Sequence, residues 1–133
     1  MKKVLILCTG NSCRSIMAEG LINKYFKNIK AYSAGSNPSG KVNPNAKKVL
    51  IEENAWKEDY HSKTIQEAMK NAPFDLVITV CDNAAKECPV IPGAKTVHIP
   101  FDDPDGKDYG EFLKTKEEIK KRLFSELRKH FRV

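Results

Sequence analysis

Apolar residues lie in short runs along the chain, separated by amphipathic stretches. The runs at 3–7 and 74–80 are typical of strands buried on both faces, and shorter runs at 30–34 and 96–98 predict two further strands. Elsewhere the apolar residues recur at helical spacing. This spacing predicts four helices: from Ser15 through Phe26, from Asn43 to about Glu53, from Ser62 to a stop before Pro73, and from Phe112 to Phe131.

Strands that alternate with helices at these lengths predict an α/β fold. We expect a single domain, residues 1–133, built on a doubly wound four-stranded parallel sheet flanked by helices on both faces. In such sheets ligands bind just beyond the carboxyl ends of the strands. That rule selects Cys8, Cys81 and the loop after His98 as the candidate site before any chemistry is considered.

The composition agrees with this fold and narrows the function. A chain of 133 residues with 41% hydrophobic and 30% charged residues is typical of a globular domain, and no apolar run approaches a membrane span. The start, Met1 to Lys3 followed by apolar residues, resembles a signal peptide, but the apolar part is too short. We therefore expect a cytoplasmic protein with no membrane partner.

The net charge of +6 comes from lysines and arginines that are interspersed with acidic residues. The densest basic cluster, 120–129, falls in a helical pattern with Glu117, Glu118 and Glu126. We interpret it as a solvated helix face and expect no nucleic-acid partner, although a positive field would attract a small anion.

The stretch between the first strand and the first helix has the composition of an anion-binding loop. It reads CTGNSCRS, from Cys8 to Ser15, and Gly10 and Asn11 tolerate positive φ. A tight loop that enters a helix aims several N–H groups at one point, and the guanidinium of Arg14 would bind two oxygens of a tetrahedral oxyanion. The predicted binding residues are Thr9, Gly10, Asn11, Ser12, Cys13 and Arg14. The alternative is an inert, buried Cys8 with Arg14 in a surface ion pair.

Cys8 is the candidate nucleophile. A thiol at a helix N-terminus beside an arginine has a lowered pKa, and Ser15 could donate a further hydrogen bond to the sulfur. Attack on an oxyanion also needs an acid to protonate the departing oxygen. The stretch from Asp102 to Gly106 could supply it, although its composition also fits an ordinary acidic turn.

Four segments together resemble one known superfamily. They are CTGNSCRSIMAEG (8–20), YSAGSNPSGKVNPNA (32–46), FDLVITVCDNAAKECPVIPGA (74–94) and HIPFDDPDG (98–106). They resemble the low-molecular-weight protein tyrosine phosphatases and, within that superfamily, the thioredoxin-coupled arsenate reductases.

The resemblance implies a mechanism, a partner and no required cofactor. Cys8 attacks arsenate, and Asp103, which directly precedes Pro104, is the acid. Cys81 then attacks Cys8 to give a transient Cys8–Cys81 disulfide and release arsenite, and Cys88 attacks Cys81 to leave a Cys81–Cys88 disulfide that thioredoxin reduces. We expect a monomer.

The residues themselves give this reading independent support. Phosphate-ester hydrolysis needs one cysteine, whereas reduction needs extra thiols, and the chain has four cysteines: Cys8, Cys13, Cys81 and Cys88. Two turns of rigid helix would separate Cys81 from Cys88 by roughly 10 Å. Disulfide Cα atoms lie within about 7 Å, so this pairing would require the segment between them to loop out.

Two departures from the family pattern concern the surroundings of the site. Ile99-Pro100 stands where these reductases often have Trp-Gly. Some relatives hold a potassium ion through residues that match Asn11, Glu19 and Ser33, plus an aspartate. Thr64 occupies that last position here, and Lys63 beside it is a candidate substitute for the cation.

Three other functions remain open at this stage. The first is a phosphatase that hydrolyses phosphate monoesters through a Cys8 phosphoenzyme, although Asp105-Gly106 stands where phosphatases usually carry an aromatic residue. The second is an oxyanion-binding or redox-sensing protein without turnover. The third is a zinc site built from Cys81, Cys88 and His98, or from the four cysteines, which lacks a tight Cys-x2-Cys pair.

Overall fold

The computed structural model describes residues 1–81 and 91–132. Within that part of the chain, one sheet of four parallel strands has the order β2-β1-β3-β4. The strands are β1 (Lys2–Cys8), β2 (Ile29–Gly35), β3 (Leu76–Thr79) and β4 (Lys95–His98). From β1 the chain first moves outward to β2 and later returns to build β3 and β4 on the other side, which confirms the predicted doubly wound α/β fold.

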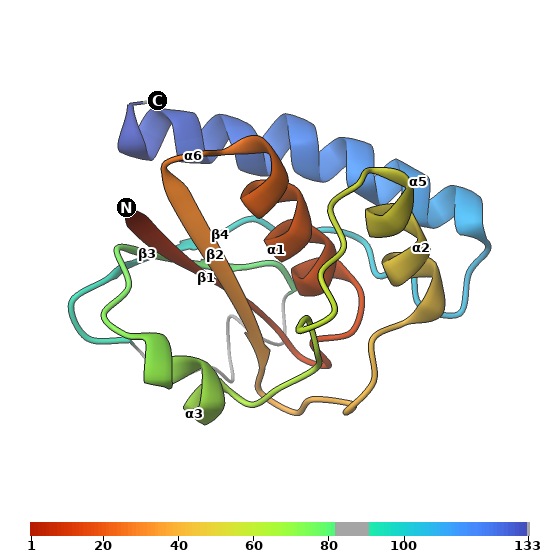
Figure 1. Ribbon diagram of the computed structural model, residues 1–133, viewed down its shortest axis with the longest axis horizontal. Coiled ribbons are helices and arrows are strands. Elements are labelled where there is room, and N and C mark those ends of the chain that lie inside the picture. The colour runs from red at the N-terminus through yellow and green to blue at the C-terminus, as the bar shows by residue number, and fades with distance from the viewer. Residues whose placement is uncertain (82–90, 133) are drawn as a thin grey trace.

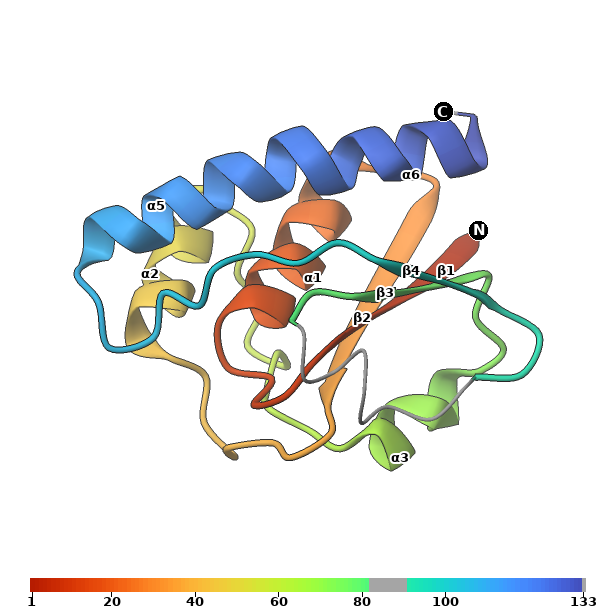
Figure 2. The same cartoon turned by 180° about the vertical axis from the view of Figure 1, so that it is seen from behind.

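Helices cover both faces of the sheet (Figures 1 and 2). One face carries α1 (Arg14–Tyr25), α2 (Pro44–Glu52) and a long C-terminal helix made of α5 (Tyr109–Glu118), a π-helical turn (Ile119–Leu123) and α6 (Phe124–Phe131). The other face carries α3 (Ile65–Ala68) and a 3-10 turn, Met69–Asn71.

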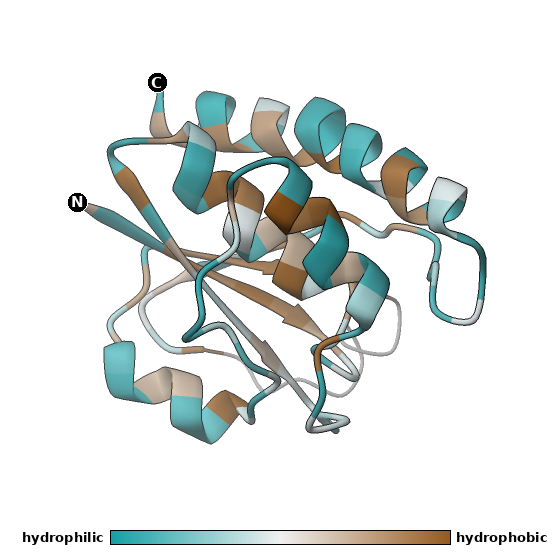
Figure 3. Cartoon of the chain, turned by 45° about the vertical axis from the view of Figure 1, so that its right-hand side comes forward, coloured by the Kyte–Doolittle hydropathy of each residue, from teal (hydrophilic) through white to brown (hydrophobic). Residues whose placement is uncertain are grey.

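The core lies between the sheet and the first group of helices. Val4–Leu7 in β1 are buried, as are Leu21 in α1 and Phe112 and Leu127 in the C-terminal helix. In Figure 3 the strands are mainly hydrophobic, while the helices alternate between hydrophobic and hydrophilic sides. Burial of each such side chain contributes roughly 1.5–3 kcal/mol to the free energy of folding. The end of β1 is therefore a rigid support for the loop that follows Cys8.

Two predicted boundaries differ from the observed ones. Ser62 does not cap the third helix; the Thr64 hydroxyl does, accepting the Glu67 N–H at 3.1 Å, because Ser62 donates instead to the Gly10 carbonyl at 3.0 Å. Strand β3 is shorter than the predicted run 74–80, although the Asp75 and Val80 N–H groups still bond to β1.

The predicted start of α2 is confirmed. The side chain of Asn43 accepts the Asn45 N–H at 2.8 Å, and Pro44 occupies the first helical position. Among the described residues, every helix is too short or too polar to span a membrane.

Strand β2 ends in direct contact with the loop that follows β1. A Cβ on Gly35 would lie 2.4 Å from the Thr9 carbonyl oxygen and 3.1 Å from the Asn11 nitrogen. Both neighbours are backbone atoms of a tight loop, so they have little freedom to move away. The absence of a side chain at Gly35 therefore fixes how closely β2 supports the loop.

Gly35→Ala is expected to destabilise the protein by about 1–3 kcal/mol, because the new methyl group overpacks the loop. Urea unfolding followed by circular dichroism measures the change. Gly10→Ala is the matched control, since a Cβ at Gly10 would meet nothing within 4 Å. An equal loss of stability in both variants would contradict the steric explanation.

Candidate active site

The loop from Cys8 to Ser15, called the oxyanion loop below, joins β1 to α1 and has its carbonyl groups turned outward. Backbone N–H groups of the segment 36–43 bond to these carbonyls at 2.9–3.2 Å: Ser36 to Cys8, Asn37 to Thr9, Ser39 to Gly10 and Asn43 to Ser12. In a trans peptide the next N–H points opposite to the carbonyl. The N–H groups that follow these carbonyls are therefore directed to the inner side, where an anion would lie.

Asn11 makes the tight turn within the oxyanion loop. Its φ is 48°, so the left-handed position predicted for Gly10 or Asn11 falls on Asn11. Its N–H lies 3.1 Å from the Cys8 sulfur, as expected for an inward-pointing group.

A chain of hydrogen bonds behind the loop has a fixed direction. The backbone N–H of Lys63 donates to Asn11 Oδ1 at 2.9 Å, so the Asn11 Nδ2 group must be the donor to Ser15 Oγ (2.7 Å) and Ser33 Oγ (3.0 Å). Ser15 Oγ accepts that bond and lies 2.8 Å from the Cys8 sulfur, so its hydroxyl can donate to the sulfur when Cys8 is the thiolate. Ser33 in turn donates to Glu19 at 2.6 Å.

The Cys8 sulfur is therefore an acceptor of hydrogen bonds at the N-terminus of α1. The residue is only 3% exposed, and this burial raises the pKa of its thiol, while the bonds from Ser15 and Asn11 lower it. The predicted net lowering of the Cys8 pKa is wrong, because burial is the larger influence. In this buried position, the hydrogen bonds from Ser15 and Asn11 are the interactions that favour the thiolate.

Arg14 and Asp103 face each other across the mouth of the loop. Arg14 Nη1 donates to the Phe101 carbonyl at 3.0 Å, and Nη2 lies 3.5 Å from Asp103 Oδ2. The Arg14 side chain is 14% exposed and the Asp103 side chain 54% exposed. Both residues line a cavity of about 140 Å³, a volume suited to a small tetrahedral anion.

Most of the predicted binding residues line this cavity. They are Cys8, Gly10, Asn11, Ser12, Cys13 and Arg14, and the acid candidate Asp103 joins them. Ser39 and Asp105 also line it and were not assigned a role from the sequence. Thr9 does not line it; its hydroxyl lies beside Cys81 instead.

The second thiol lies next to the oxyanion loop. Cys81 follows β3, is buried, and its sulfur is 3.3 Å from Thr9 Oγ1. No disulfide joins Cys8, Cys13 and Cys81 to one another. Cys88, and with it the predicted Cys81–Cys88 pairing, lies outside the described residues. His98 bonds to Thr79 Oγ1 at 2.7 Å, and in the described part of the chain no group of three or more His, Cys, Asp or Glu side chains could hold a metal ion.

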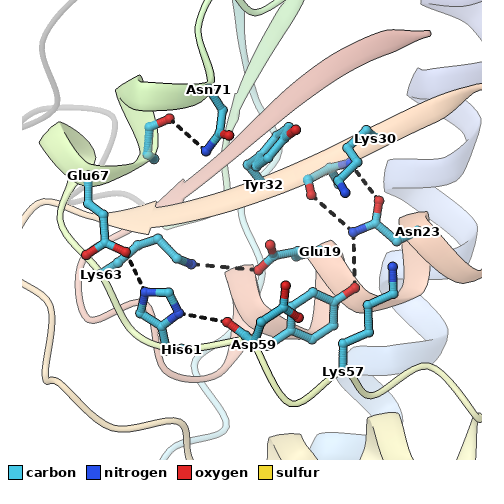
Figure 4. Close-up of a pocket in the computed structure, with 13 residues that line it drawn as sticks. Glu19, Asn23, Lys30, Tyr32, Lys57, Asp59, His61, Lys63, Glu67 and Asn71 are labelled. Atoms are coloured by element: carbon cyan, nitrogen blue, oxygen red, sulfur yellow. Dashed lines mark hydrogen bonds and ion pairs between the residues drawn. The ribbon is translucent and has the colours of Figure 1, made fainter.

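A second, larger cavity of about 280 Å³ opens behind the loop, between α1, β2 and α3 (Figure 4). Lys63 points toward Glu19 there: its Nζ donates to the Ser33 carbonyl at 3.1 Å and lies 4.0 Å from Glu19 Oε1. Burial raises the Glu19 pKa to about 6, while Lys63 and Ser33 lower it. The oxygens expected to hold a monovalent cation are already engaged by Lys63 and the hydrogen-bond chain, so the residues do not fit such an ion.

Comparison with known proteins agrees with this geometry. Residues 3–132 match the family of low molecular weight phosphotyrosine protein phosphatases. The chain belongs to this family.

The relatives include proteins named arsenate reductase. One from Bacillus cereus (strain AH187) is 44% identical over 129 residues, covering 94% of this chain and 95% of that one. The crystal structure of arsenate reductase from Archaeoglobus fulgidus has a TM-score of 0.74 at 33% identity, covering 90% of this chain and 94% of that one. A structure described as an arsenate reductase in the phosphate binding state has a TM-score of 0.77 at 27% identity, covering 97% and 98%. The resemblance inferred from the sequence is confirmed.

Ser15→Ala should raise the Cys8 pKa further, since it removes the hydroxyl that donates to the sulfur. The loss of one hydrogen bond to a charged group corresponds to a rise of about one to two pKa units. The pH dependence of iodoacetamide alkylation, followed on the Cys8 peptide by mass spectrometry, measures the shift.

Ser39→Ala is the control, because among the described residues the Ser39 hydroxyl bonds only within its own turn, to Lys41. Its alkylation midpoint should equal that of the wild type. If Ser15→Ala left the midpoint unchanged as well, the directed bond from Ser15 to Cys8 would be wrong.

Proposed function

We propose that the protein is an arsenate reductase that uses Cys8 as its nucleophile. The observation that carries the proposal is the position of a further buried thiol, Cys81, which follows another strand and lies directly beside the oxyanion loop that holds Cys8. Hydrolysis of a phosphate ester needs one cysteine and water, whereas a two-electron reduction needs further thiols. The similarity to proteins named arsenate reductase supports the same substrate.

Arsenate binds within the oxyanion loop, on its inward N–H groups and the Arg14 guanidinium. The Cys8 thiolate attacks arsenic, a sulfur–arsenic bond forms, and one arsenic–oxygen bond breaks. Asp103 protonates the departing oxygen, which leaves as water. The 3.5 Å separation between Arg14 and Asp103 suits an acid that lies next to the bound anion.

The reduction uses the electrons of the sulfur–arsenic bond. The Cys81 thiolate attacks the Cys8 sulfur, a Cys8–Cys81 disulfide forms, and the two bonding electrons pass to arsenic, which leaves as arsenite. Cys88 then attacks Cys81 and releases the Cys8 thiolate, leaving a Cys81–Cys88 disulfide. An external dithiol, which we take to be thioredoxin, reduces that disulfide. The protein acts in the cytoplasm as a monomer.

Phosphatase activity is the second candidate, and the cavity itself favours it only as a side reaction. The oxyanion loop would accept phosphate as readily as arsenate. However, none of the described residues that line the cavity is aromatic, so a phenyl ring would have no stacking partner. We expect slow hydrolysis of aryl phosphates through Cys8.

The three thiols are tested by arsenate-dependent NADPH oxidation with thioredoxin and thioredoxin reductase. Cys8→Ser, Cys81→Ser and Cys88→Ser should each lose multiple turnover, by at least about 100-fold, because each step needs a distinct sulfur. Cys88→Ser should still produce one arsenite per protein in a single turnover. Cys13→Ser is the matched control and should retain multiple turnover.

Two outcomes would contradict the relay. Cys81→Ser and Cys88→Ser could turn over as fast as the wild type. Alternatively, the wild type could form no arsenite yet hydrolyse aryl phosphates through Cys8, in which case the protein is a phosphatase.

Lys63 takes the place of a bound monovalent cation in this proposal, so no cofactor is needed. Lys63→Met would leave a buried carboxylate without its partner. Such a loss costs about 3–5 kcal/mol when the remaining group is charged. The pKa of Glu19, about 6 in the folded protein, would rise further without Lys63.

The expected loss of stability in Lys63→Met depends on pH. A carboxyl group whose folded pKa is raised contributes stability below its unfolded pKa, and this stability is lost as pH rises through the folded value. Lys63→Met should therefore lose far more stability at pH 8 than at pH 5. Thermal unfolding at both pH values checks this, and potassium chloride, but not choline chloride, should restore part of the loss at pH 8. A wild type that is itself stabilised by potassium over choline would show that Lys63 does not replace the cation.

A further inference from the structure

One side-chain hydrogen bond joins the candidate acid loop to the start of α2. Asn43 Nδ2 donates to Asp105 Oδ1 at 2.8 Å. The direction of this bond is fixed, because Asn43 Oδ1 already accepts the Asn45 N–H at 2.8 Å. Figure 2 shows the chain from β4 running toward the N-terminal end of α2 before α5 begins.

Asp105 is in turn connected to the acid. Its backbone N–H donates to Asp103 Oδ1 at 3.0 Å, while Asp103 Oδ2 faces Arg14 at 3.5 Å. Both oxygens of Asp103 are therefore oriented, one by the Asp105 amide and one by the guanidinium. A carboxyl group that is free to rotate would present its proton to the departing oxygen only part of the time.

Asn43 also contacts the oxyanion loop. Its backbone N–H donates to the Ser12 carbonyl at 3.0 Å. One residue thus binds the anion-holding loop through its backbone and the acid loop through its side chain. Any shift of Asn43 would change the distance between the oxyanion loop and Asp103, which must act on the same anion.

The backbone of the acid loop is held at two buried residues, Phe101 and Pro104, and among the described residues its backbone hydrogen bonds to other segments are made at Phe101. The Phe101 N–H bonds to Val80, and its carbonyl accepts from Arg14. Residues 103–107 bond to Asn43 and contact Arg14. Their other described hydrogen bonds are local to the loop. The side chains of Asp103 and Asp105 are exposed, so packing does not hold them.

We infer that Asn43 and Asp105 form a latch that positions Asp103 over the oxyanion loop, and that both are positioning residues for the acid step. This inference rests on the proposed role of Asp103 as the acid. Neither residue needs to touch the substrate for the latch to act.

A swap of the two side chains tests the latch without disturbing the helix. Asn43→Asp keeps an oxygen to cap α2 and places a negative charge at its N-terminus, which is favourable for helix stability. The same change replaces the donor with a carboxylate that repels Asp105. Asp105→Asn keeps an acceptor for Asn43, and the double variant pairs a carboxylate at 43 with an amide at 105.

We expect Asn43→Asp to lower kcat for arsenate about tenfold, with KM changed less than about twofold, because the loss falls on proton transfer rather than on binding. Asp105→Asn removes a charge from the cavity lining and so can change KM, but it keeps the acceptor for Asn43, so its kcat should lie within about threefold of the wild type; the double variant should recover most of the lost kcat. In an Asp103→Asn background, Asn43→Asp should have no further effect, since there is no acid left to position. A purely structural role would still lower the rate in that background.

A second readout does not depend on activity. Hydrogen exchange of the peptide 99–112 should quicken in Asn43→Asp and return to the wild-type rate in the double variant. If Asn43→Asp matches the wild type in both kcat and exchange, the latch is overturned. If the wild type forms no arsenite, the proposed function fails instead. The latch is then tested by the rates at which the same variants hydrolyse phenyl phosphate and p-nitrophenyl phosphate. There the latch predicts a loss mainly for phenyl phosphate, whose leaving group needs the proton.

Discussion

Asn11 holds the site together through its side-chain amide and its left-handed backbone. Its amide oxygen accepts the Lys63 N–H, its amide nitrogen donates to Ser15 and Ser33, and its own N–H bonds to the Cys8 sulfur. Since the residue is fully buried, any unmet donor or acceptor would be costly. This one amide fixes the direction of the bonds to Ser15 and Ser33, and it leaves the Ser15 hydroxyl proton available to a Cys8 thiolate.

Burial of the site disfavours the negative charge of both Cys8 and Glu19. Burial raises the pKa of Cys8 and of Glu19, so neither negative charge is favoured by its surroundings alone. Ser15 and Asn11 offset this for the sulfur, and Lys63 and Ser33 offset it for the carboxyl group. The two charges are connected through Ser33, Asn11 and Ser15, so the charge on Glu19 affects the polarisation of the bonds that end at Cys8.

The sequence was sufficient for the sheet and for the oxyanion loop. Apolar runs located all four strands, and the composition of residues 8–15 indicated the anion-binding loop, because both features are local. The roles of Ser62, Ser39 and the Asn43–Asp105 pair were not predicted, since each depends on segments that meet only in the folded chain. Asn43 was predicted only as a helix cap. That role explains the hydrogen bond that its Oδ1 accepts from Asn45, but not the one that its Nδ2 donates to Asp105. The predicted direction of the Cys8 pKa shift was wrong. The prediction rested on the helix N-terminus and on Arg14, which are close to Cys8 in the sequence, whereas the extent of burial depends on segments that pack around Cys8 only in the folded chain.

The position of Cys81 follows from the sheet rather than from the oxyanion loop. Strand β3 pairs with β1 in a register that places Thr79 opposite Leu7, and the Val80 N–H bonds to the Leu7 carbonyl. The next residue, Cys81, must therefore emerge beside the residues that follow Leu7, which are Cys8 and Thr9. An oxyanion loop alone supports substitution at a tetrahedral centre. The adjacent parallel strand places a further thiol beside that loop, 3.3 Å from Thr9 Oγ1, and in the proposed reaction this thiol is the second nucleophile that a two-electron reduction requires.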